Sequence, residues 1–460
     1  MPLLRLIAEG VGPFERLDVD LSDGKGNPHL GPHIFAGVNG SGKSTVLRAL
    51  AWVMDVRDGG FPHGDWAHVT AGYGNSGALL VTAQPWGPAY VRESYRGTPT
   101  EALDWAKSAL AATDLSPQRF NANGVATSQG VTVAIWQETG TPHPETTFNI
   151  ATYGPSRSLR HIETVDLTKR LSTPHENALS FEGTVQNDVV QSWLVGQYSR
   201  RAIARDRQQS GDQYTRTLDR FGKALRSLYG ESVSFEVEIE PSLQPRLKAF
   251  GHTLDFSQLP DGVRSTVGWI ADFMMRQELM QWDERLKGKR PGVLLLDEVD
   301  AHLHPLWQRK LLPAMREALP DVQILVTSHS PFVISSCPGS RVHVLELDDN
   351  GRARARPPVD SPIGESITTT LKEIFGVDSR FDVLTERELD EWNTLKRGEV
   401  TGSLSAAEKL RLEKLTTTLA ERSEELKSIV ASPLKIPGSV LRSLSANDAK
   451  PHPVKRRKRA

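Results

Sequence analysis

Apolar residues along this chain follow two patterns, short strand-like runs and stretches with helical spacing. The segment "LLRLIAEGVGPFERLDVDL" predicts two strands around a Gly-Pro turn, and "HIFAGVNG" predicts a buried strand that leads into a glycine-rich loop. Directly after this loop, apolar side chains recur at the spacing of an α-helix, at Val46, Leu47, Leu50, Ala51 and Met54. The N-terminal part therefore has the order strand, glycine loop, helix.

The middle of the chain predicts more strands and one helical hairpin. Residues 72–160 alternate strand-like runs with turn-rich polar segments, which indicates a meander that extends the sheet. Residues 182–230 show the spacing of two helices, and no sustained heptads extend them into a long coiled coil. The segment "SVSFEVEIE" then returns to a strand.

The C-terminal part contains a βαβ pattern followed by helices. The apolar runs "GVLLLDEVD" and "VQILVTSHS" flank the helical stretch "PLWQRKLLPAMREAL", which implies parallel, buried strands. A further strand, "VHVLELD", follows, and residues 363–430 have the spacing of amphipathic helices. The end of the chain is rich in proline and charge and has almost nothing to bury, which is typical of a disordered tail.

Composition excludes several classes of protein. The 460 residues allow two or three domains, and 55 basic side chains nearly balance 56 acidic ones, so net charge predicts no partner. The single cysteine, Cys337, excludes an internal disulfide and a cysteine-based zinc site. The N-terminus lacks the pattern of a secretory signal, and no run of 18 uncharged apolar residues occurs. We therefore expect a soluble, cytoplasmic protein.

The stretch "GVNGSGKST" fits the phosphate-binding P-loop pattern G-x-x-x-x-G-K-[ST]. Its glycines let backbone N–H groups point at phosphate oxygens, Lys43 neutralises the β and γ phosphates, and Ser44 is expected to hold Mg²⁺. A glycine-rich turn is the alternative, but a chain of this length matches by chance only about once in several tens of cases. We expect ATP to contact Gly37, Asn39, Gly40, Ser41, Gly42, Lys43, Ser44 and Thr45.

The segment "VLLLDE" supplies the carboxylates that nucleotide hydrolysis needs. Four apolar residues bury the strand, and Asp297 and Glu298 follow at its tip. Asp297 is the expected metal ligand, and Glu298 is the candidate base or water-orienting group. An acidic pair after a strand is by itself more typical of a solvated loop, but the P-loop upstream favours the functional interpretation.

The distance in sequence between Lys43 and Asp297 requires an insertion that separates two halves of one site. With these motifs the chain resembles the ABC-type ATPases of the SMC, RecF and OLD-like branch, whose head is assembled from N- and C-terminal segments. The resemblance implies an α/β fold, a P-loop NTPase head with a mixed sheet, an inserted short helical hairpin and an α-helical C-terminal region. The expected parts are 1–181 and 233–358 as the two halves of the head, 182–232 as the helical insertion, 359–435 as the helical region and 436–460 as a disordered basic tail.

The segment "LPDGVRST" is similar to the signature motif of this branch, with Asp261 and Gly262 as candidate nucleotide contacts. These families place a serine where Pro260 stands, and that serine touches the γ-phosphate bound by the opposite subunit. The resemblance therefore implies that this contact is lost, while Asp261, the Gly262 amide and the helix dipole still serve. A plain helix cap is the alternative for this segment.

The string "DEVDAHLHP" is similar to a DE-to-HLHP stretch of OLD-like ATPases, which implies that Ala301–His304 occupy the position of the D-loop at the dimer interface. A metal site formed by Asp300, His302 and His304 is the other interpretation. We disfavour it because these residues lie on a turn that enters a helix at Pro305, and no further ligand is evident.

The segment "LVTSHSP" places His329 just beyond a buried strand, where the resemblance implies the switch histidine that senses the γ-phosphate. The segment "YGPSR" resembles a motif near the Q-loop that contacts Mg²⁺, and Gln137 and Arg157 are the two candidates for that role. A plain turn is an equal alternative for this segment.

Two basic patches admit nucleic acid as a partner. Arg200, Arg201, Arg205 and Arg207 lie on one predicted helix, and "KRRKR" occupies residues 455–459. A solvated helix and a solubilising tail are the alternatives, and salt-dependent binding of DNA or RNA distinguishes them.

The resemblance implies a homodimer or higher homo-oligomer that closes around ATP, with the P-loop of one copy facing the signature of the other. No nuclease or Toprim motif occurs after residue 350, which indicates a separately encoded effector nuclease. The arrangement resembles ATPase subunits of antiphage systems such as Septu, PARIS and retron-associated complexes. The alternatives are a RecF-like DNA-repair ATPase that binds DNA directly, a transporter ATPase, and a scaffold with an inactive site.

Overall fold

The computed structural model divides into two compact units, Met1–Gly376 and Val377–Ala460, which are described separately. The described residues are 3–54, 76–84, 87–96, 98–111, 120–128, 131–138, 149–160, 162, 165–240, 242–362, 364–377 and 381–431. The predicted disordered tail, 436–460, with its basic segment, lies outside them. Among the described residues, no helix has the length and apolar character needed to cross a lipid bilayer. The predicted division into five parts stays a prediction.

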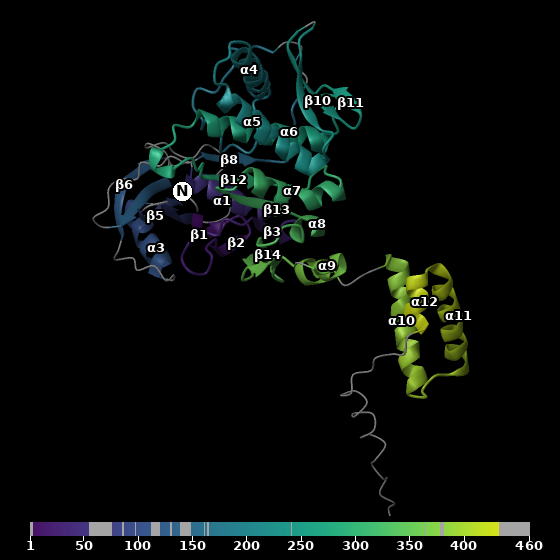
Figure 1. The fold of residues 1–460 in the computed structure, drawn as a ribbon. Coiled ribbons are helices and arrows are strands. Elements are labelled where there is room, and N and C mark those ends of the chain that lie inside the picture. Colours follow the sequence, from purple (N-terminus) through teal and green to yellow (C-terminus); the bar gives the residue numbers. More distant parts are fainter. Residues whose placement is uncertain are drawn as a thin grey trace, which may run out of the picture. The chain divides into compact units, whose positions relative to one another are not determined.

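The larger unit is built on a seven-stranded sheet (Figure 1). Its strands are β3 (His33–Gly37), β8 (Asn149–Tyr153), β12 (Gly292–Leu296), β13 (Val322–Ser328), β14 (Arg341–Leu347), β15 (Ala353–Ala355) and β16 (Val359–Asp360). The order is β15-β14-β3-β13-β12-β8, with β16 also beside β14. Five strands are parallel, whereas β15 and β16 are antiparallel to β14. The predicted mixed sheet and the predicted βαβ pattern are confirmed.

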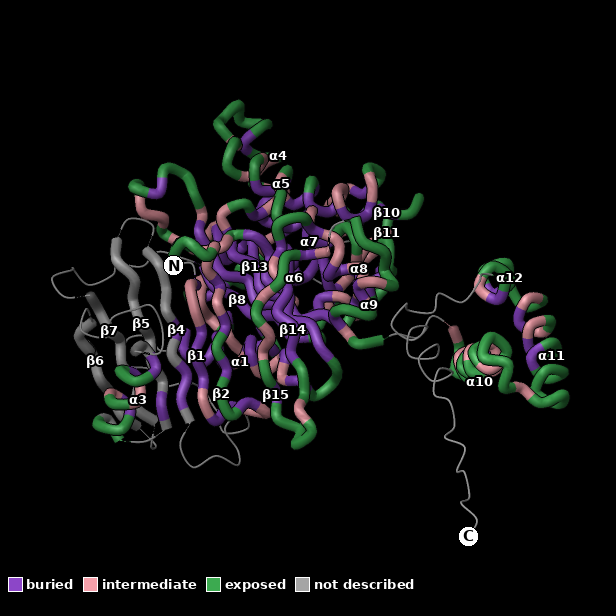
Figure 2. Tube along the Cα trace, turned by 90° about the horizontal axis from the view of Figure 1, so that it is seen from below, coloured by how far each residue is buried: buried purple, intermediate pink, exposed green. Residues whose placement is uncertain are grey.

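Both faces of this sheet are covered. Successive side chains along a strand point to opposite sides, and in the central strands both sets are apolar. In β12, Leu294 and Leu296 belong to one apolar core, and Val293 and Leu295 belong to the other. The first core contains residues of α4 (Asn187–Asp206), α5 (Asp212–Tyr229), α6 (Asp261–Leu279), α7 (Pro305–Ala318), α8 (Pro331–Ile334) and α9 (Ile367–Phe375). The second contains α1 (Lys43–Met54), β1 (Leu3–Val11) and β2 (Phe14–Asp20). Figure 2 shows the central strands as the buried layer.

A second sheet is antiparallel and six-stranded, in the order β2-β1-β4-β5-β7-β6. It adds β4 (Ser76–Gln84), β5 (Gly87–Arg96), β6 (Phe120–Ser128) and β7 (Val131–Glu138) to β1 and β2. The predicted meander is confirmed for β4 to β7, but these strands extend the sheet of β1 and β2, and only β8 joins the seven-stranded sheet. Strands joined by short turns pair with one another, and β4 completes this meander by pairing with β1.

A helix that the pattern did not predict, α3 (Pro99–Ala111), lies between β5 and β6. Its buried residues Ala102, Ala106 and Ala109 have helical spacing, but small alanines among strand-like runs give a weak signal. The predicted helical hairpin is confirmed as α4 and α5, and β9 (Ser234–Glu238) is the strand expected after it. β9 pairs with β10 (Gln244–Ala249), which pairs with β11 (His252–Leu254).

The smaller unit is helical, as predicted. The described residues of this unit form α10 (Val383–Val400), α11 (Ala406–Arg422) and α12 (Glu424–Ala431). A capping box between Ser405 and Glu408 starts α11. Its apolar core has the i, i+3, i+4 spacing of packed helices and contains Leu389, Trp392, Leu412, Leu415, Leu419, Leu426 and Val430.

A histidine pair lies in the core beside the strand that leads into the glycine loop. His33 Nδ1 and His343 Nε2 are 3.0 Å apart, and the His343 ring stacks on Phe35 at 4.8 Å between ring centroids. Burial lowers the pKa of His33 well below its usual value and lowers the pKa of His343 to about 3. Both rings are therefore neutral in the folded protein at pH 7.

Because of this pair, we expect the protein to become less stable as the pH is lowered from 7. The folded-state pKa values are depressed, so below about pH 6.5 the unfolded chain binds protons that the folded chain does not. Between pH 7 and 5.5 the His343 ring is expected to remove about 1 kcal/mol from the free energy of unfolding, measured by urea titration, and the His33 ring adds a loss in the same direction. The double variant His33→Asn/His343→Asn should lose this share of the pH dependence. An equal pH dependence in the variant contradicts the prediction.

Candidate nucleotide-binding site

The glycine loop joins the end of β3 to the start of α1 and has little space for side chains. A Cβ added at Gly37 would lie 2.2 Å from the Leu345 carbonyl oxygen, and one at Gly42 would lie 2.4 Å from the Phe14 ring. Gly42 also has a φ of +88°, which only glycine adopts readily. The predicted strand, loop and helix are confirmed, and two of the P-loop glycines are required by close packing.

Lys43, the first residue of α1, folds back over the loop. Its ammonium nitrogen donates hydrogen bonds to the carbonyl oxygens of Gly37 at 3.1 Å and Val38 at 3.0 Å. The side chain is 7% exposed, and burial lowers its pKa. The hydroxyl of Ser41 is buried, and no described group forms a hydrogen bond with it. A partly desolvated cation beside an unpaired hydroxyl fits a phosphate group.

The two distant halves of the chain meet at Asp297. Ser44 Oγ donates a hydrogen bond to Asp297 Oδ1 at 2.9 Å, and Thr327 Oγ1 donates to the same oxygen at 2.6 Å. Parallel strands bring these residues together, because β3, β13 and β12 are neighbours and end at the same edge of the sheet. One hydroxyl and one carboxylate oxygen at this separation are the hard oxygen donors that Mg²⁺ prefers, so the residues fit a magnesium nucleotide.

Glu298 and His329 lie at the same edge with exposed side chains. The Glu298 N–H donates to Thr327 Oγ1 at 2.7 Å, and Glu298 has a left-handed φ of +46°. His329 follows β13, and its pKa is lowered by partial burial and by the charge of Lys43. The imidazole is therefore neutral at pH 7 and has one nitrogen that donates and one that accepts.

Arg157 holds the acidic tip in place through backbone contacts. Its guanidinium donates to the carbonyl oxygens of Asp297 at 2.6 Å and Glu298 at 3.0 Å, and to Ser265 Oγ in α6 at 3.2 Å. The side chain is 4% exposed, and burial lowers its pKa to about 10, so it stays charged at pH 7. The sequence predicted Arg157 only as a candidate for the Q-loop residue and did not predict these contacts. The other candidate, Gln137, lies in β7 of the antiparallel sheet, opposite Tyr90.

The candidate signature segment forms the start of α6. Pro260 is its N-cap, Asp261 is its first residue, and Asp261 forms an ion pair with Arg264. A Cβ added at Gly262 would lie 2.3 Å from the carbonyl oxygen of His302. The glycine therefore lets the first turn of α6 pack directly on the segment predicted to be the D-loop.

His302 and His304 of that segment have different surroundings. His304 is the N-cap of α7, and its Nδ1 accepts a hydrogen bond from the Leu306 N–H at 3.2 Å. His302 is exposed, with a left-handed φ of +61°. Within the described ranges, no three histidine, cysteine, aspartate or glutamate side chains are grouped so that they could share a metal ion.

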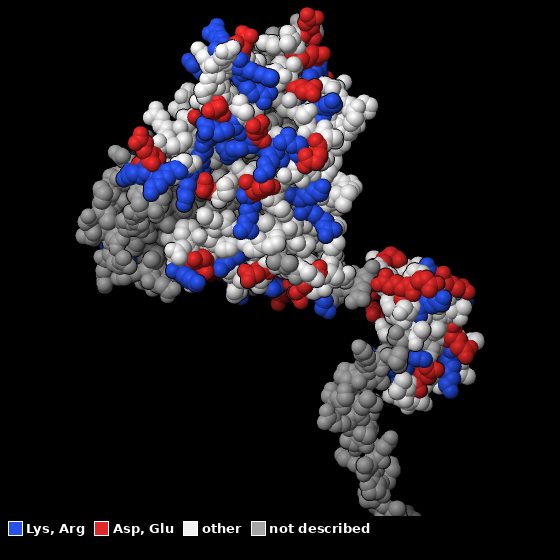
Figure 3. Space-filling view, in the orientation of Figure 1, with Lys and Arg blue, Asp and Glu red and all other residues white. Residues whose placement is uncertain are grey.

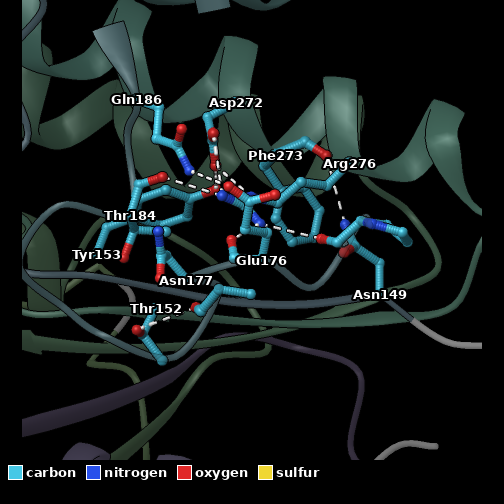
Figure 4. Close-up of polar contacts among 12 residues, drawn as sticks. Asn149, Thr152, Tyr153, Glu176, Asn177, Thr184, Gln186, Asp272, Phe273 and Arg276 are labelled. Atoms are coloured by element: carbon cyan, nitrogen blue, oxygen red, sulfur yellow. Dashed lines mark hydrogen bonds and ion pairs between the residues drawn. The ribbon is translucent and has the colours of Figure 1, made fainter. Parts of the chain in front are cut away.

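A buried ionic network, which the sequence did not predict, fixes the far half of α6 (Figure 4). Arg276 donates to Asp272 at 2.6 Å, and both side chains are fully buried. Tyr153, the last residue of β8, donates its hydroxyl to the same Asp272 oxygen at 2.6 Å. The remaining Arg276 N–H groups donate to carbonyl oxygens of a neighbouring segment, those of Pro174, Glu176 and Thr184.

We predict that Arg276→Met destabilises the larger unit by about 3–5 kcal/mol, because it leaves the Asp272 carboxylate buried without its partner. The double variant Arg276→Met/Asp272→Asn should recover part of this loss, since it removes the unpaired charge and keeps an acceptor for Tyr153. Urea unfolding followed by far-UV circular dichroism measures both. A single variant within about 1 kcal/mol of the parent chain would show that the network carries little stability.

Strand order and site together define the class of this chain. A P-loop between β3 and α1, an acidic tip after β12 and a histidine after β13 all lie at one edge of a mostly parallel sheet. An antiparallel sheet packs on one side of it, and the hairpin α4–α5 packs on the other. The chain therefore has an α/β fold in which a mixed, mostly parallel sheet carries a P-loop, as predicted.

Comparison with known proteins gives the particular relatives. The family model "AAA domain, putative AbiEii toxin, Type IV TA system" matches residues 189–335. The chain is 32% identical over 115 residues to the Septu protein PtuA of Bacillus thuringiensis, covering 23% of this chain and 29% of that protein. It is 22% identical over 152 residues to the Retron Vc95 probable ATPase of Vibrio cholerae serotype O1 biovar El Tor, covering 32% and 29%. It is 31% identical over 94 residues to the Retron Ec83 probable ATPase of Escherichia coli, covering 20% and 17%.

The predicted resemblance to Septu and retron ATPases is therefore confirmed, although the chain spans less than a third of the length of each of these three relatives. Solved structures with similarity include an SMC head bound to the C-winged helix domain of ScpA, with 15% identity, a TM-score of 0.43 and coverage of 79% of this chain and 98% of that chain. The SMC head domain from Thermotoga maritima has 18% identity, a TM-score of 0.39 and coverage of 78% of this chain and 99% of that chain. With TM-scores this low, the fold assignment depends on the strand order and the motif positions.

Proposed function

We propose that this chain binds and hydrolyses ATP with Mg²⁺ as its cofactor. The 2.9 Å hydrogen bond from Ser44 Oγ to Asp297 Oδ1 carries the proposal. It joins the P-loop hydroxyl to the strand-tip carboxylate, the two groups that nucleotide hydrolysis requires on one metal ion. The similarity to two retron proteins named probable ATPases also supports this activity.

In the proposed site, Lys43 neutralises the β and γ phosphates, and backbone N–H groups of residues 37–45 surround the phosphate oxygens. Ser44 and Asp297 would hold Mg²⁺, which would offset the charge that develops on the phosphate oxygens. Glu298 orients the attacking water and accepts its proton. His329, neutral at pH 7, donates a hydrogen bond to the γ-phosphate.

We propose further that two copies close around ATP. The loop residues Val38, Asn39 and Gly40 are exposed, as are Asp261 and His329, so the nucleotide site is open on the side where a second copy would bind. Pro260 has no hydroxyl, so Asp261, the Gly262 N–H and the positive end of α6 are the groups that face the partner's γ-phosphate. Hydrolysis removes this bridge and lets the copies separate.

The proposed role is that of the sensor and scaffold subunit of an antiphage defence complex that controls a separately encoded effector nuclease. The similarity to Septu protein PtuA and to retron ATPases supports this proposal. Direct DNA binding by a RecF-like ATPase is the second candidate. It is favoured by Arg200, Arg201 and Arg205 near the end of α4, none of which forms an ion pair with a carboxylate of the described residues.

The variant Glu298→Gln is expected to lower kcat for ATP hydrolysis by about 10²–10⁴-fold, because it removes the proton acceptor, while ATP binding is retained. Phosphate release measures the rate, and equilibrium dialysis measures binding. Lys43→Ala should instead lose ATP affinity. The control Glu240→Gln changes an exposed carboxylate that belongs to none of the motifs and should leave both values unchanged.

The same variant also tests dimer formation, because ATP that is bound and not hydrolysed should hold two copies together. Light scattering of Glu298→Gln should give twice the monomer mass with ATP and the monomer mass without it. Near-zero turnover in both the parent chain and Glu298→Gln would support an inactive scaffold and contradict the ATPase proposal. A constant mass would contradict the dimer alone.

A further inference from the structure

A cavity of about 750 Å³ lies apart from the nucleotide site. It is lined by Gln197 of α4 and by residues of α5, the end of α6, the segment before β12 and the turn before β13. Pro320, Asp321 and Val322 line it at the amino end of β13, whereas Asp297 and His329 follow the carboxyl ends of β12 and β13. The cavity and the P-loop site are therefore at opposite edges of the same sheet. Its volume falls in the range of about 300–1,000 Å³ that is typical of small-ligand sites.

The cavity has an excess of positive charge. Its lining contains four basic side chains, Arg216, Arg220, Lys289 and Arg290, and two acidic ones, Glu278 and Asp321. Among the residues that the structure describes, none of the four basic groups forms an ion pair. In Figure 3, Lys and Arg side chains gather on the face that carries α4, α5 and α6.

The two carboxylates are already occupied by neutral donors. Glu278 accepts hydrogen bonds from Trp193 Nε1 at 3.1 Å, from Gln197 Nε2 at 2.7 Å and from the Thr217 hydroxyl. Asp321 accepts from the backbone N–H of Arg290 at 3.1 Å. The carboxylates therefore fix the walls of the cavity, and the basic groups keep donors for a ligand.

Gln197 and Arg220 keep hydrogen-bonding atoms that a ligand can use. Gln197 is 5% exposed, and its Oε1 has no hydrogen-bond partner among the described residues. Arg220 is partly buried and uses one nitrogen, Nη2, for Gln277 Oε1 at 3.1 Å and the Ala318 carbonyl at 3.3 Å. Burial and the nearby charge of Arg290 lower the pKa of Arg220, and an anion would relieve this repulsion.

An aromatic wall completes the cavity. Tyr214 and Trp282 line it, and the Trp282 indole is held in place by a hydrogen bond from Nε1 to the Gln277 carbonyl at 2.8 Å. Fixed aromatic rings beside arginines form a surface on which a planar base stacks while its phosphate is bound by guanidinium groups.

We propose that this cavity binds a nucleotide, with the phosphate held by Arg216, Arg220, Lys289 and Arg290 and the base stacked on the aromatic wall beside the Gln197 amide. The ligand is either a free nucleotide or the 5′-phosphorylated end of a nucleic acid, which present the same groups. It would contact the last turn of α6 through Gln277 and Glu278, and the first turn of that helix carries Asp261 and Gly262.

The test measures binding of AMP, of pyrophosphate and of a 5′-phosphorylated DNA tetranucleotide to the full chain by calorimetry. Lys43→Ala provides the background, because it disables the P-loop without touching the cavity. Arg216→Glu and Lys289→Glu are the cavity variants, and both change exposed side chains. Lys287→Glu is the matched control, since it makes the same charge reversal two residues from Lys289 but outside the lining.

AMP is expected to bind the Lys43→Ala chain saturably. Adding Arg216→Glu or Lys289→Glu should weaken AMP binding by about tenfold or more, whereas adding Lys287→Glu should change the affinity by no more than about twofold. Trp282→Leu should weaken AMP but leave pyrophosphate unchanged, which reports the stacked base. If the cavity variants weaken binding of the tetranucleotide while AMP does not bind, the source of the phosphate is a nucleic-acid end. The proposal would be overturned if Lys287→Glu weakened AMP binding as much as the cavity variants do. It would also be overturned if Lys43→Ala by itself abolished AMP binding. Turnover and the Glu298→Gln readouts are independent of these outcomes.

Discussion

The hydrogen bond between Ser44 and Asp297 is the contact on which the rest of the site depends, because it joins the start of α1 to the tip of β12. These residues are far apart in sequence, and only parallel pairing of β3, β13 and β12 brings them to one edge of the sheet. Thr327 strengthens the junction by donating to the Asp297 carboxylate and accepting from the Glu298 N–H. The acidic tip is thereby oriented toward the P-loop.

Two buried arginines hold the helix that carries the candidate signature. Arg157 joins the carbonyl oxygens of the acidic tip to Ser265 in the first half of α6. Arg276 pairs with Asp272 of the same helix and joins the second half of α6 to backbone carbonyl oxygens of the neighbouring segment. A buried charge is costly unless it is fully hydrogen-bonded, and these two guanidinium groups meet that condition mainly through backbone oxygens. The first half of α6 is thus hydrogen-bonded directly to the acidic tip through Arg157.

The sequence predicted the P-loop, the acidic strand tip, the helical hairpin and the parallel βαβ pattern, because each has a local pattern of apolar spacing and fixed residue types. It did not predict which sheet β4 to β7 join, since alternation along a strand does not specify its partner. It also missed the clamp formed by Arg157 and the network of Arg276. Backbone carbonyls accept most of their hydrogen bonds, and no residue pattern marks such acceptors. Thr327 was missed for a related reason, because a threonine that ends a buried strand is common.

The most direct test of the central claim is electron paramagnetic resonance of Mn²⁺, used in place of Mg²⁺, with ATP and the full chain. The account predicts one Mn²⁺ per chain that binds together with ATP and shows coupling to phosphorus nuclei. It also predicts that Ser44→Ala and Asp297→Asn each weaken this binding and change the spectrum. Mn²⁺ and ATP that bind the Asp297→Asn chain with unchanged affinity and an unchanged spectrum would show that the two halves of the chain do not share one metal site.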